Sequence, residues 1–306
     1  MRARLGVVKL EEFSIVPEQI WPEHVARHRQ RAQFWTLPAL ERRSRGIVHP
    51  VEDFLFTYYP FALSKLEQWH PGFGRGLQVT EDTRPVWLTK NYRCEGGVMF
   101  CDPDLLSDKE KARLLWIRAL LVNTSRQAGN FGCFGMHEWA MVYRSEEIRH
   151  GEVTGLRMEA EELNRFVESR PIRCSHYDAF RFFTPAAMPL NQLQPDLDGR
   201  LVNEQPGCIH ANMDLYKWAS KCQVWLPGEL LLDTFALAME LRSLDMRASP
   251  YDLEKFGYEA VRIETVEGRR QYEEQQRGLA DKAAVLRERM IAALDRVVAE
   301  FPVRAC

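Results

Sequence analysis

Four short segments of the chain place a histidine and a carboxylate within four residues of each other, among aromatic side chains. The segments are HPVED from residue 49, MHEW from residue 136, SHYD from residue 175 and HANMD from residue 210. Histidine changes its charge near neutral pH, and a neighbouring carboxylate can orient the ring or move the proton itself. The recurrence of this pattern indicates an enzyme with a buried site of histidine, carboxylate and aromatic residues.

The first chemistry that these residues predict is general acid and base catalysis. Burial among aromatic rings raises the pKa of a carboxylate, and a carboxylate that orients a histidine prepares it to move a proton. His137 is the first choice of base or proton shuttle. The predicted catalytic residues are His137, Glu138, Glu52, Asp53, Asp178 and Asp214. The aromatic residues predicted to bind a flat substrate are Phe131, Trp139, Tyr143, Tyr58, Phe180 and Trp218.

A divalent metal ion is the alternative, because histidine and carboxylate side chains together suit iron, manganese or zinc. The candidate ligands are His49, His137, His176 and His210. The sequence contains neither an HExxH motif nor the paired ExxH motif of di-iron helical bundles, so the ligand types fit but their spacing identifies no particular metal. Such an enzyme would act on a small aromatic or nucleobase-like molecule.

Two further hypotheses require no metal. A non-enzymatic binding module would use the aromatic residues as a pocket and would tie up its carboxylates in structural hydrogen bonds. A nucleophilic thiol is the weaker hypothesis, suggested by Cys133 near His137 and by Cys174 near His176. Proximity in sequence is not what such a pair needs, because a thiol and its base must be close in space.

The charge of the chain gives little support to nucleic-acid binding. The formal net charge is -2, although the tract from His24 to Gly46 sets six arginines against a single acid, Glu41. This tract suits a solvated helix face or a DNA-binding patch. The arginines of such a patch are Arg27, Arg29, Arg31, Arg42, Arg43 and Arg45.

The cysteines and the apolar runs predict the compartment. Seven scattered cysteines without a CxxC pair do not suit a disulfide framework. Apolar runs stay shorter than the roughly 18 residues that a membrane span requires. We therefore expect a cytoplasmic protein with no membrane attachment.

Helical periodicity dominates the elements that must position these residues. Residues 18–46 predict a basic amphipathic helical region that is interrupted near Pro38. Pro50 suits the first turn of a further helix, which would carry Glu52 and Asp53 near the positive end of its dipole. Together these patterns place both carboxylates at a helix start.

The second half of the helical pattern has clear boundaries. Ser107 and Glu110 form a capping box, the signature of a helix start. Residues 265–301 predict a long C-terminal helix with one apolar face. That face would cover the body of the protein or join a second copy in a homo-oligomer.

Strand signals are confined to one region. Leu77–Val79, Val86–Thr89 and Val98–Cys101 are short, turn-bounded runs that predict a small β meander near residues 77–101. The pattern shows no internal repeat and no linker. The sequence therefore predicts a mainly α fold with a minor β component, as a single compact helical domain over residues 1–306.

Several strings of the sequence resemble a group of bacterial proteins, mainly from actinobacteria, that are commonly labelled 3-methyladenine DNA glycosylase. These strings are HPVEDFLFTYY, NFGCFGMHEWAMVY, HANMDLYKWA and LDMRASPYD, and the likeness extends from about residue 20 to about residue 297. The resemblance implies hydrolysis of the N-glycosidic bond of a modified or alkylated purine. It further implies an aromatic pocket for the extruded base and a carboxylate that activates water or stabilises the cationic sugar.

The sequence departs from one pattern of DNA glycosylases, the helix-hairpin-helix loop. Glu229 follows Leu226 to Gly228 at a position where a further glycine would be required, so Asp233 is not predicted to be catalytic. The near-neutral charge makes a free nucleobase, a nucleoside or another small molecule the alternative to a DNA substrate.

Overall fold

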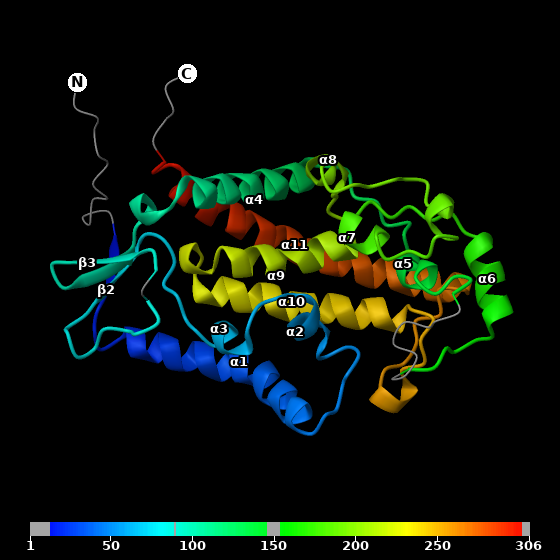
Figure 1. The fold of residues 1–306 in the computed structure, drawn as a ribbon, viewed down its shortest axis with the longest axis horizontal. Helices are drawn as coiled ribbons and strands as arrows, with labels where there is room; N and C mark the ends of the chain where they lie inside the picture. Colours follow the sequence, from blue (N-terminus) through cyan, green and yellow to red (C-terminus); the bar gives the residue numbers. More distant parts are fainter. Residues whose placement is uncertain (1–12, 89, 146–153, 302–306) are drawn as a thin grey trace, which may run out of the picture.

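The computed structural model describes residues 13–88, 90–145 and 154–301. Helices make up most of this part of the chain, and one small mixed sheet accompanies them (Figure 1). The predicted fold class, mainly α with a minor β component, is confirmed.

Four long helices run side by side along the molecule: α4 (Asp108–Arg126), α9 (Ile209–Lys221), α10 (Gly228–Arg247) and α11 (Val266–Val298). α9 and α10 lie next to each other in the centre, α11 packs against both, and α4 packs against α11 (Figure 1). None of the helices in the described residues combines the length and apolarity that crossing a bilayer requires.

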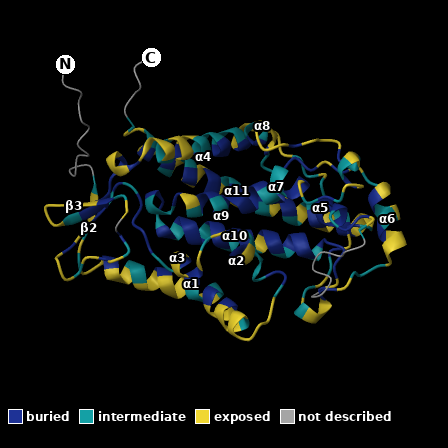
Figure 2. Cartoon of the chain, viewed as in Figure 1, coloured by how far each residue is buried: buried dark blue, intermediate teal, exposed yellow. Residues whose placement is uncertain are grey.

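α10 is central because its sequence is apolar on nearly every side. Leu230, Leu231, Leu232 and Phe235 are all buried although they point in different directions around the helix. Figure 2 shows buried residues along both α9 and α10. Charged residues on such a helix must find partners inside the protein, because a lone buried charge is expensive.

Both α4 and α11 begin after a capping side chain, and the first of these caps was predicted. Ser107 accepts a hydrogen bond from the Glu110 backbone while the Glu110 side chain bonds back to Ser107, so the predicted capping box is confirmed. Thr265 caps α11, which matches the helix predicted at residues 265–301. The apolar face of α11 covers α9, α10 and α4. Contact with a second copy of the chain stays a prediction.

α1 (Trp21–Ser44) is the predicted basic amphipathic region and packs against α10. The predicted interruption near Pro38 is wrong, because the helix continues through this proline. It bends toward its C-terminal end in Figure 1, the usual response of a helix to an internal proline. The outer face of α1 leaves the Phe34 side chain 75% exposed.

Two short helices follow α1 and cover the centre of the bundle: α2 (Phe54–Tyr58) and α3 (Leu63–Leu66). The helix predicted to start at Pro50 starts later, at Phe54, and Pro50 lies in the preceding turn. The Asp53 carboxylate accepts the backbone N–H of His49 and holds that turn. Glu52 and Asp53 therefore precede the helix.

The sheet contains β1 (Ser14–Val16), β2 (Arg75–Gln78), β3 (Tyr92–Glu95) and β4 (Val98–Cys101) in the order β1-β2-β4-β3. β1 runs parallel to β2, and the other pairs are antiparallel. The predicted meander is wrong in two respects. β4 and not β3 follows β2 in the sheet, and Val86–Leu88 lie in a turn and its flank, with Thr89 outside the described residues.

The remaining short elements lie mostly at the end of the bundle away from the sheet (Figure 1). The short α-helices are α5 (Met136–Ala140), α6 (Ala160–Glu168), α7 (Tyr177–Phe180) and α8 (Arg200–Asn203). The 3-10 helices are η2 (Pro103–Leu105), η3 (Met188–Leu190), η4 (Gln223–Trp225) and η5 (Glu254–Phe256). α5 and the start of α7 bring His137 and His176 toward α9 and α10, and α8 carries Arg200.

Candidate functional site

His137, His210 and Asp245 form a compact cluster, called here the first cluster. His137 comes from α5, His210 from α9 and Asp245 from α10. Each offers a nitrogen or oxygen atom, and these atoms lie within 4.8 Å of one another. His137 Nε2 is 2.8 Å from Asp245 Oδ1, and the two histidine rings meet edge to face with their centroids 4.2 Å apart.

The glycine-rich loop before α5 aims His137 at α10. Gly135 has a φ of 72°, a left-handed conformation that glycine adopts without steric cost, and α5 starts directly after it. The Trp139 indole N–H then donates to the Ala248 carbonyl at 2.8 Å, just past the end of α10. These two features bring the His137 ring to Asp245.

Arg242 supplies the positive charge behind the first cluster. Its Nη1 atom lies 2.8 Å from Glu138 Oε1 and 3.0 Å from Asp245 Oδ2, and all three side chains are buried. The guanidinium carbon lies 3.7 Å from the centroid of the Phe54 ring, which adds a cation–π contact. Arg242 therefore occupies one oxygen of Asp245, and the other faces His137.

The pKa values of the first cluster reflect burial and mutual charge. Burial lowers the pKa of His137, but the charge and close contact of Asp245, together with Cys133 and the charge of Glu138, raise that pKa to about 10. Burial opposes ionisation of Asp245, yet the charge of His137 holds the pKa of that carboxyl well below its usual range. Burial, and then the charge of His137, depress the pKa of His210. In this arrangement His137 is a cation near neutral pH, Asp245 is an anion and His210 is neutral.

The closest contact of the first cluster is not a hydrogen bond of acceptable geometry. His137 Nε2 and Asp245 Oδ1 are both fully buried, and neither has a hydrogen-bond partner among the described residues. Buried polar atoms are normally satisfied, so each exception requires an explanation. Here the two atoms are in contact at 2.8 Å without the geometry of an N–H···O hydrogen bond.

A small cavity adjoins the two histidines. Its volume is about 10 Å³, which is room for roughly one water molecule. Its lining includes His137, His210 and the thiols of Cys133, Cys174 and Cys208. Burial raises the pKa of Cys208 to about 12 and that of Cys174 well above its usual range. These two thiols are therefore protonated near neutral pH, which does not favour them as nucleophiles.

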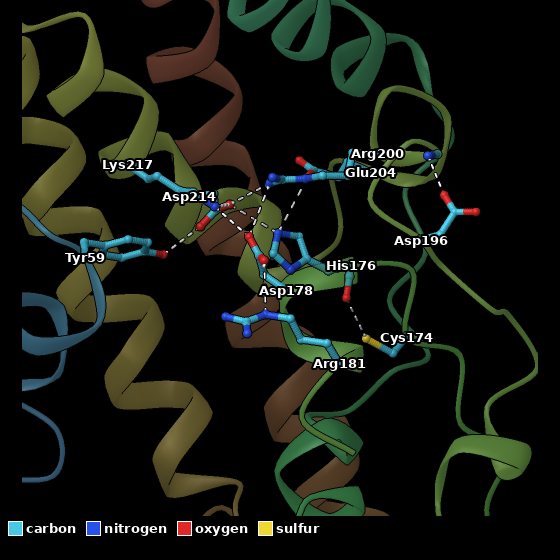
Figure 3. Close-up of polar contacts among 11 residues, drawn as sticks. Tyr59, Cys174, His176, Asp178, Arg181, Asp196, Arg200, Glu204, Asp214 and Lys217 are labelled. Carbon is cyan, nitrogen blue, oxygen red and sulfur yellow. Dashed lines mark hydrogen bonds and ion pairs between the residues drawn. The ribbon is translucent and has the colours of Figure 1, made fainter. Parts of the chain in front are cut away.

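His176, Glu204 and Asp214 form a second cluster (Figure 3). The His176 ring stacks on the His210 ring with centroids 5.6 Å apart, so the two clusters adjoin. His176 Nε2 lies 3.4 Å from Asp214 Oδ2 and 3.7 Å from Glu204 Oε1. Three of the four predicted segments thus converge, through His137, His176 and His210.

Cations fill the surroundings of the second cluster. Lys217 Nζ lies 2.9 Å and Arg200 Nη2 3.2 Å from Asp214 Oδ2, and the Tyr59 hydroxyl donates to Asp214 Oδ1 at 2.8 Å (Figure 3). Arg200 Nε also donates to Glu204 at 3.0 Å. The charge of Lys217, against an opposing effect of burial, holds the pKa of Asp214 far below its usual range. Asp214 is an anion whose two oxygens are already engaged.

The HPVED segment does not join these clusters. Arg42 binds Glu52 at 2.8 Å and Asp53 at 2.6 Å, and the His49 Nδ1 atom accepts the backbone N–H groups of Val51 and Glu52. Asp178 pairs with Lys217 at 2.7 Å beside the second cluster. All five predicted carboxylates therefore form ion pairs, as the binding-module hypothesis expects. Asp245 was not predicted from the sequence. Its Oδ1 atom is buried without a hydrogen-bond partner among the described residues.

The six predicted aromatic residues do not line the cavity. Trp139, Phe180 and Trp218 belong to the buried core. Tyr143 donates to Glu168 at 2.8 Å, and Tyr58 stacks on Phe54. Phe131 lies under the Arg277 guanidinium, 4.0 Å from its carbon. Their role in substrate binding stays a prediction.

Four residues that complete the clusters were not identified from the sequence: Asp245, Arg242, Glu204 and Arg200. A signal was present for the first two. Arg242 and Asp245 stand three residues apart in the apolar pattern of α10, and a charged pair on such a helix indicates a buried interaction. Glu204 and Arg200 lie in a long, polar connection, where charge alone predicts exposure.

Fold and site define a mainly helical protein with a buried histidine and carboxylate centre between α5, α9 and α10. None of the protein-family models, curated proteins or solved structures compared with the chain matches it. Function is therefore inferred from the site itself.

Proposed function

We propose that this protein is a hydrolase that activates a water molecule at the first cluster. The observation that carries the proposal is the pair of His137 and Asp245, 2.8 Å apart, with His137 and the neutral His210 lining a cavity that has room for roughly one water. His210 can accept a proton from a water in this cavity as the water attacks a substrate.

The bond that we propose for hydrolysis is the N-glycosidic bond of a modified or alkylated purine. This choice rests on the resemblance of the four sequence strings described above. The water oxygen attacks the sugar carbon, the carbon–nitrogen bond breaks, and its electron pair leaves with the base. The proton that the water loses passes through the cluster to a nitrogen of the leaving base.

A nucleoside or a single modified base fits the surroundings better than duplex DNA. Arg29, Arg31, Arg42 and Arg45 each form an ion pair with a protein carboxylate, and Arg43 donates to the Phe56 carbonyl. These contacts compete with phosphate binding, so DNA binding by the arginine tract is the second candidate. The cavity is much smaller than a purine, and the segments around it must separate for a substrate to reach the cluster.

We further place the protein in the cytoplasm, as a proposal from its thiols. Cys94, Cys101, Cys133, Cys174, Cys208 and Cys222 are free thiols. A reducing compartment keeps such thiols free. Association of two copies through α11 remains part of the same proposal.

The test is base release by purified protein from two substrates, an alkylated purine nucleoside and alkylated DNA. We expect release from the nucleoside, and a loss of about 10²–10⁴-fold in rate for His137→Gln, the range of general acid and base effects. Asp233→Asn, at a half-buried position of α10 outside the two clusters, is the control and should keep the wild-type rate. Absence of release from both substrates would refute the proposed hydrolysis.

A further inference from the structure

We propose that His137, His210 and Asp245 bind one divalent transition-metal ion, with zinc as the ion that best suits two imidazoles, one carboxylate and a water. Catalytic zinc sites commonly use three protein ligands and leave one position for water. The use of the ion in catalysis rests on the proposed hydrolysis, whereas its binding rests on the geometry of the cluster.

The first argument is the position of the donor atoms. Zinc binds imidazole nitrogen and carboxylate oxygen at about 2.0–2.2 Å, so ligand atoms around a tetrahedral ion stand roughly 3.3 Å apart. The three donor atoms of the first cluster already lie within 4.8 Å of one another, on three different helices. Small side-chain movements would therefore complete the coordination.

The second argument is the unsatisfied pair in that cluster. His137 is 1% exposed and Asp245 is fully buried, and the facing atoms of the two side chains have no hydrogen-bond partner within the described chain. The His137 nitrogen and the Asp245 oxygen stand 2.8 Å apart without hydrogen-bond geometry, close enough to bind one cation together once the imidazole has lost its proton. A shared cation would satisfy both atoms.

The outer contacts of the first cluster are those of a metal site. Arg242 holds Asp245 Oδ2 at 3.0 Å and leaves Oδ1 for the ion. Such outer contacts orient the ligands of known metal sites. The adjoining cavity offers the position for the metal-bound water, which the ion would make a stronger acid.

The second cluster provides an internal comparison. It contains one histidine and two carboxylates, whereas the first cluster contains two histidines and one carboxylate. In the second cluster, Arg200, Lys217 and Tyr59 already occupy the oxygens of Asp214 (Figure 3). A divalent ion there would lie beside two cations. The geometry therefore assigns the metal to the first cluster and an ion-pair network to the second.

The experiment is metal analysis of the full-length protein purified without chelator, followed by zinc titration of the chelator-treated protein. We expect about one zinc per chain in both preparations. His210→Ala should lower bound zinc at least tenfold, while Glu204→Gln, the matched change in the second cluster, should keep about one equivalent. Circular dichroism of each variant verifies that it is folded.

X-ray absorption of the zinc-loaded wild type tests the ligands without any substitution. The expected spectrum shows scattering from two imidazole ligands of the zinc ion and none from a sulfur ligand. Sulfur ligation would place the metal on the neighbouring cysteines and overturn the assignment, as would zinc loss in Glu204→Gln alone. If the wild type does not bind zinc, the metal site is refuted, and the contact between His137 and Asp245 is an ion pair that shares a proton. Zinc binding without base release would refute the hydrolysis alone.

Discussion

His137 Nε2 lies 2.8 Å from Asp245 Oδ1, and this contact joins the glycine-entered helix α5 to the central helix α10. Both atoms are buried and neither completes a hydrogen bond with a described residue. Asp245 is also bound by Arg242, which in turn holds Glu138. Asp245 thus links the first cluster to the Arg242 guanidinium, whose positive charge balances the negative charge of this carboxylate.

Asp245→Asn should strongly destabilise the protein. The change removes the anion between His137 and Arg242, and breaking a buried ion pair costs about 3–5 kcal/mol. Asp233→Asn is the control on the same helix, because Asp233 pairs with Arg31 and Arg289 at the surface and such pairs contribute about 0–1 kcal/mol each. The free energy of unfolding in urea measures both. Equal effects of the two substitutions would contradict a buried network.

Tyr59→Phe and Tyr216→Phe should have different effects although the two rings touch. Tyr59 donates to the buried anion Asp214, so its loss should cost about 1.5–3 kcal/mol. The buried Tyr216 hydroxyl has no hydrogen-bond partner in the described ranges, so its removal should leave stability within about 0.5 kcal/mol or raise it. Chemical denaturation of both variants distinguishes these outcomes. A large loss for Tyr216→Phe would reveal a partner for its hydroxyl.

Two glycines of α11 should respond in opposite directions to alanine. A Cβ atom on Gly268 would overlap the backbone carbonyl of Arg262, so Gly268→Ala should destabilise by about 1–3 kcal/mol or more. A Cβ atom on Gly278 would meet nothing within 4 Å, so Gly278→Ala should stabilise by about 0.5–1 kcal/mol. Thermal unfolding of both variants is the measurement. Destabilisation by Gly278→Ala would show that this position of α11 is not free.

His70 should make the protein less stable in acid. Burial, with a smaller effect from His28, lowers the pKa of His70 from 6.5 to about 3. Between these values the unfolded chain binds a proton that the folded protein does not, so stability falls as the pH decreases from about 6.5. At pH 5 the loss due to His70 is about 2 kcal/mol.

His70→Gln should remove this part of the pH dependence. Urea unfolding at pH 7, 6 and 5 should show a shallower decrease for the variant than for the wild type. Tyr92→Phe is the control, because it deletes the hydroxyl 3.0 Å from His70 Nδ1 but keeps the titrating ring. It should lower stability by a similar amount at each pH. An unchanged slope for His70→Gln would mean that the pKa of His70 is the same in the folded and the unfolded protein.

Features that depend on residues close together in the chain could be predicted from the sequence. The capping box at Ser107, the apolar face of α11 and the mainly helical class all follow from local patterns, and the structure contains them. The sequence also singled out His137, His176 and His210, because each stands within four residues of a carboxylate among aromatic residues. In the structure the His210 ring contacts both of the others, the His137 ring edge to face and the His176 ring by stacking.

Tertiary structure alone decided which charges face one another. Glu138 and Arg242 are separated by 104 positions, and no local pattern encodes that α5 would be carried to the end of α10. The same packing turned HPVED toward Arg42 and away from the histidines, and it made Asp245 the carboxylate of the first cluster. Local periodicity fixes which face of a helix is buried, but only the packing of distant helices chooses the partner that each buried charge finds.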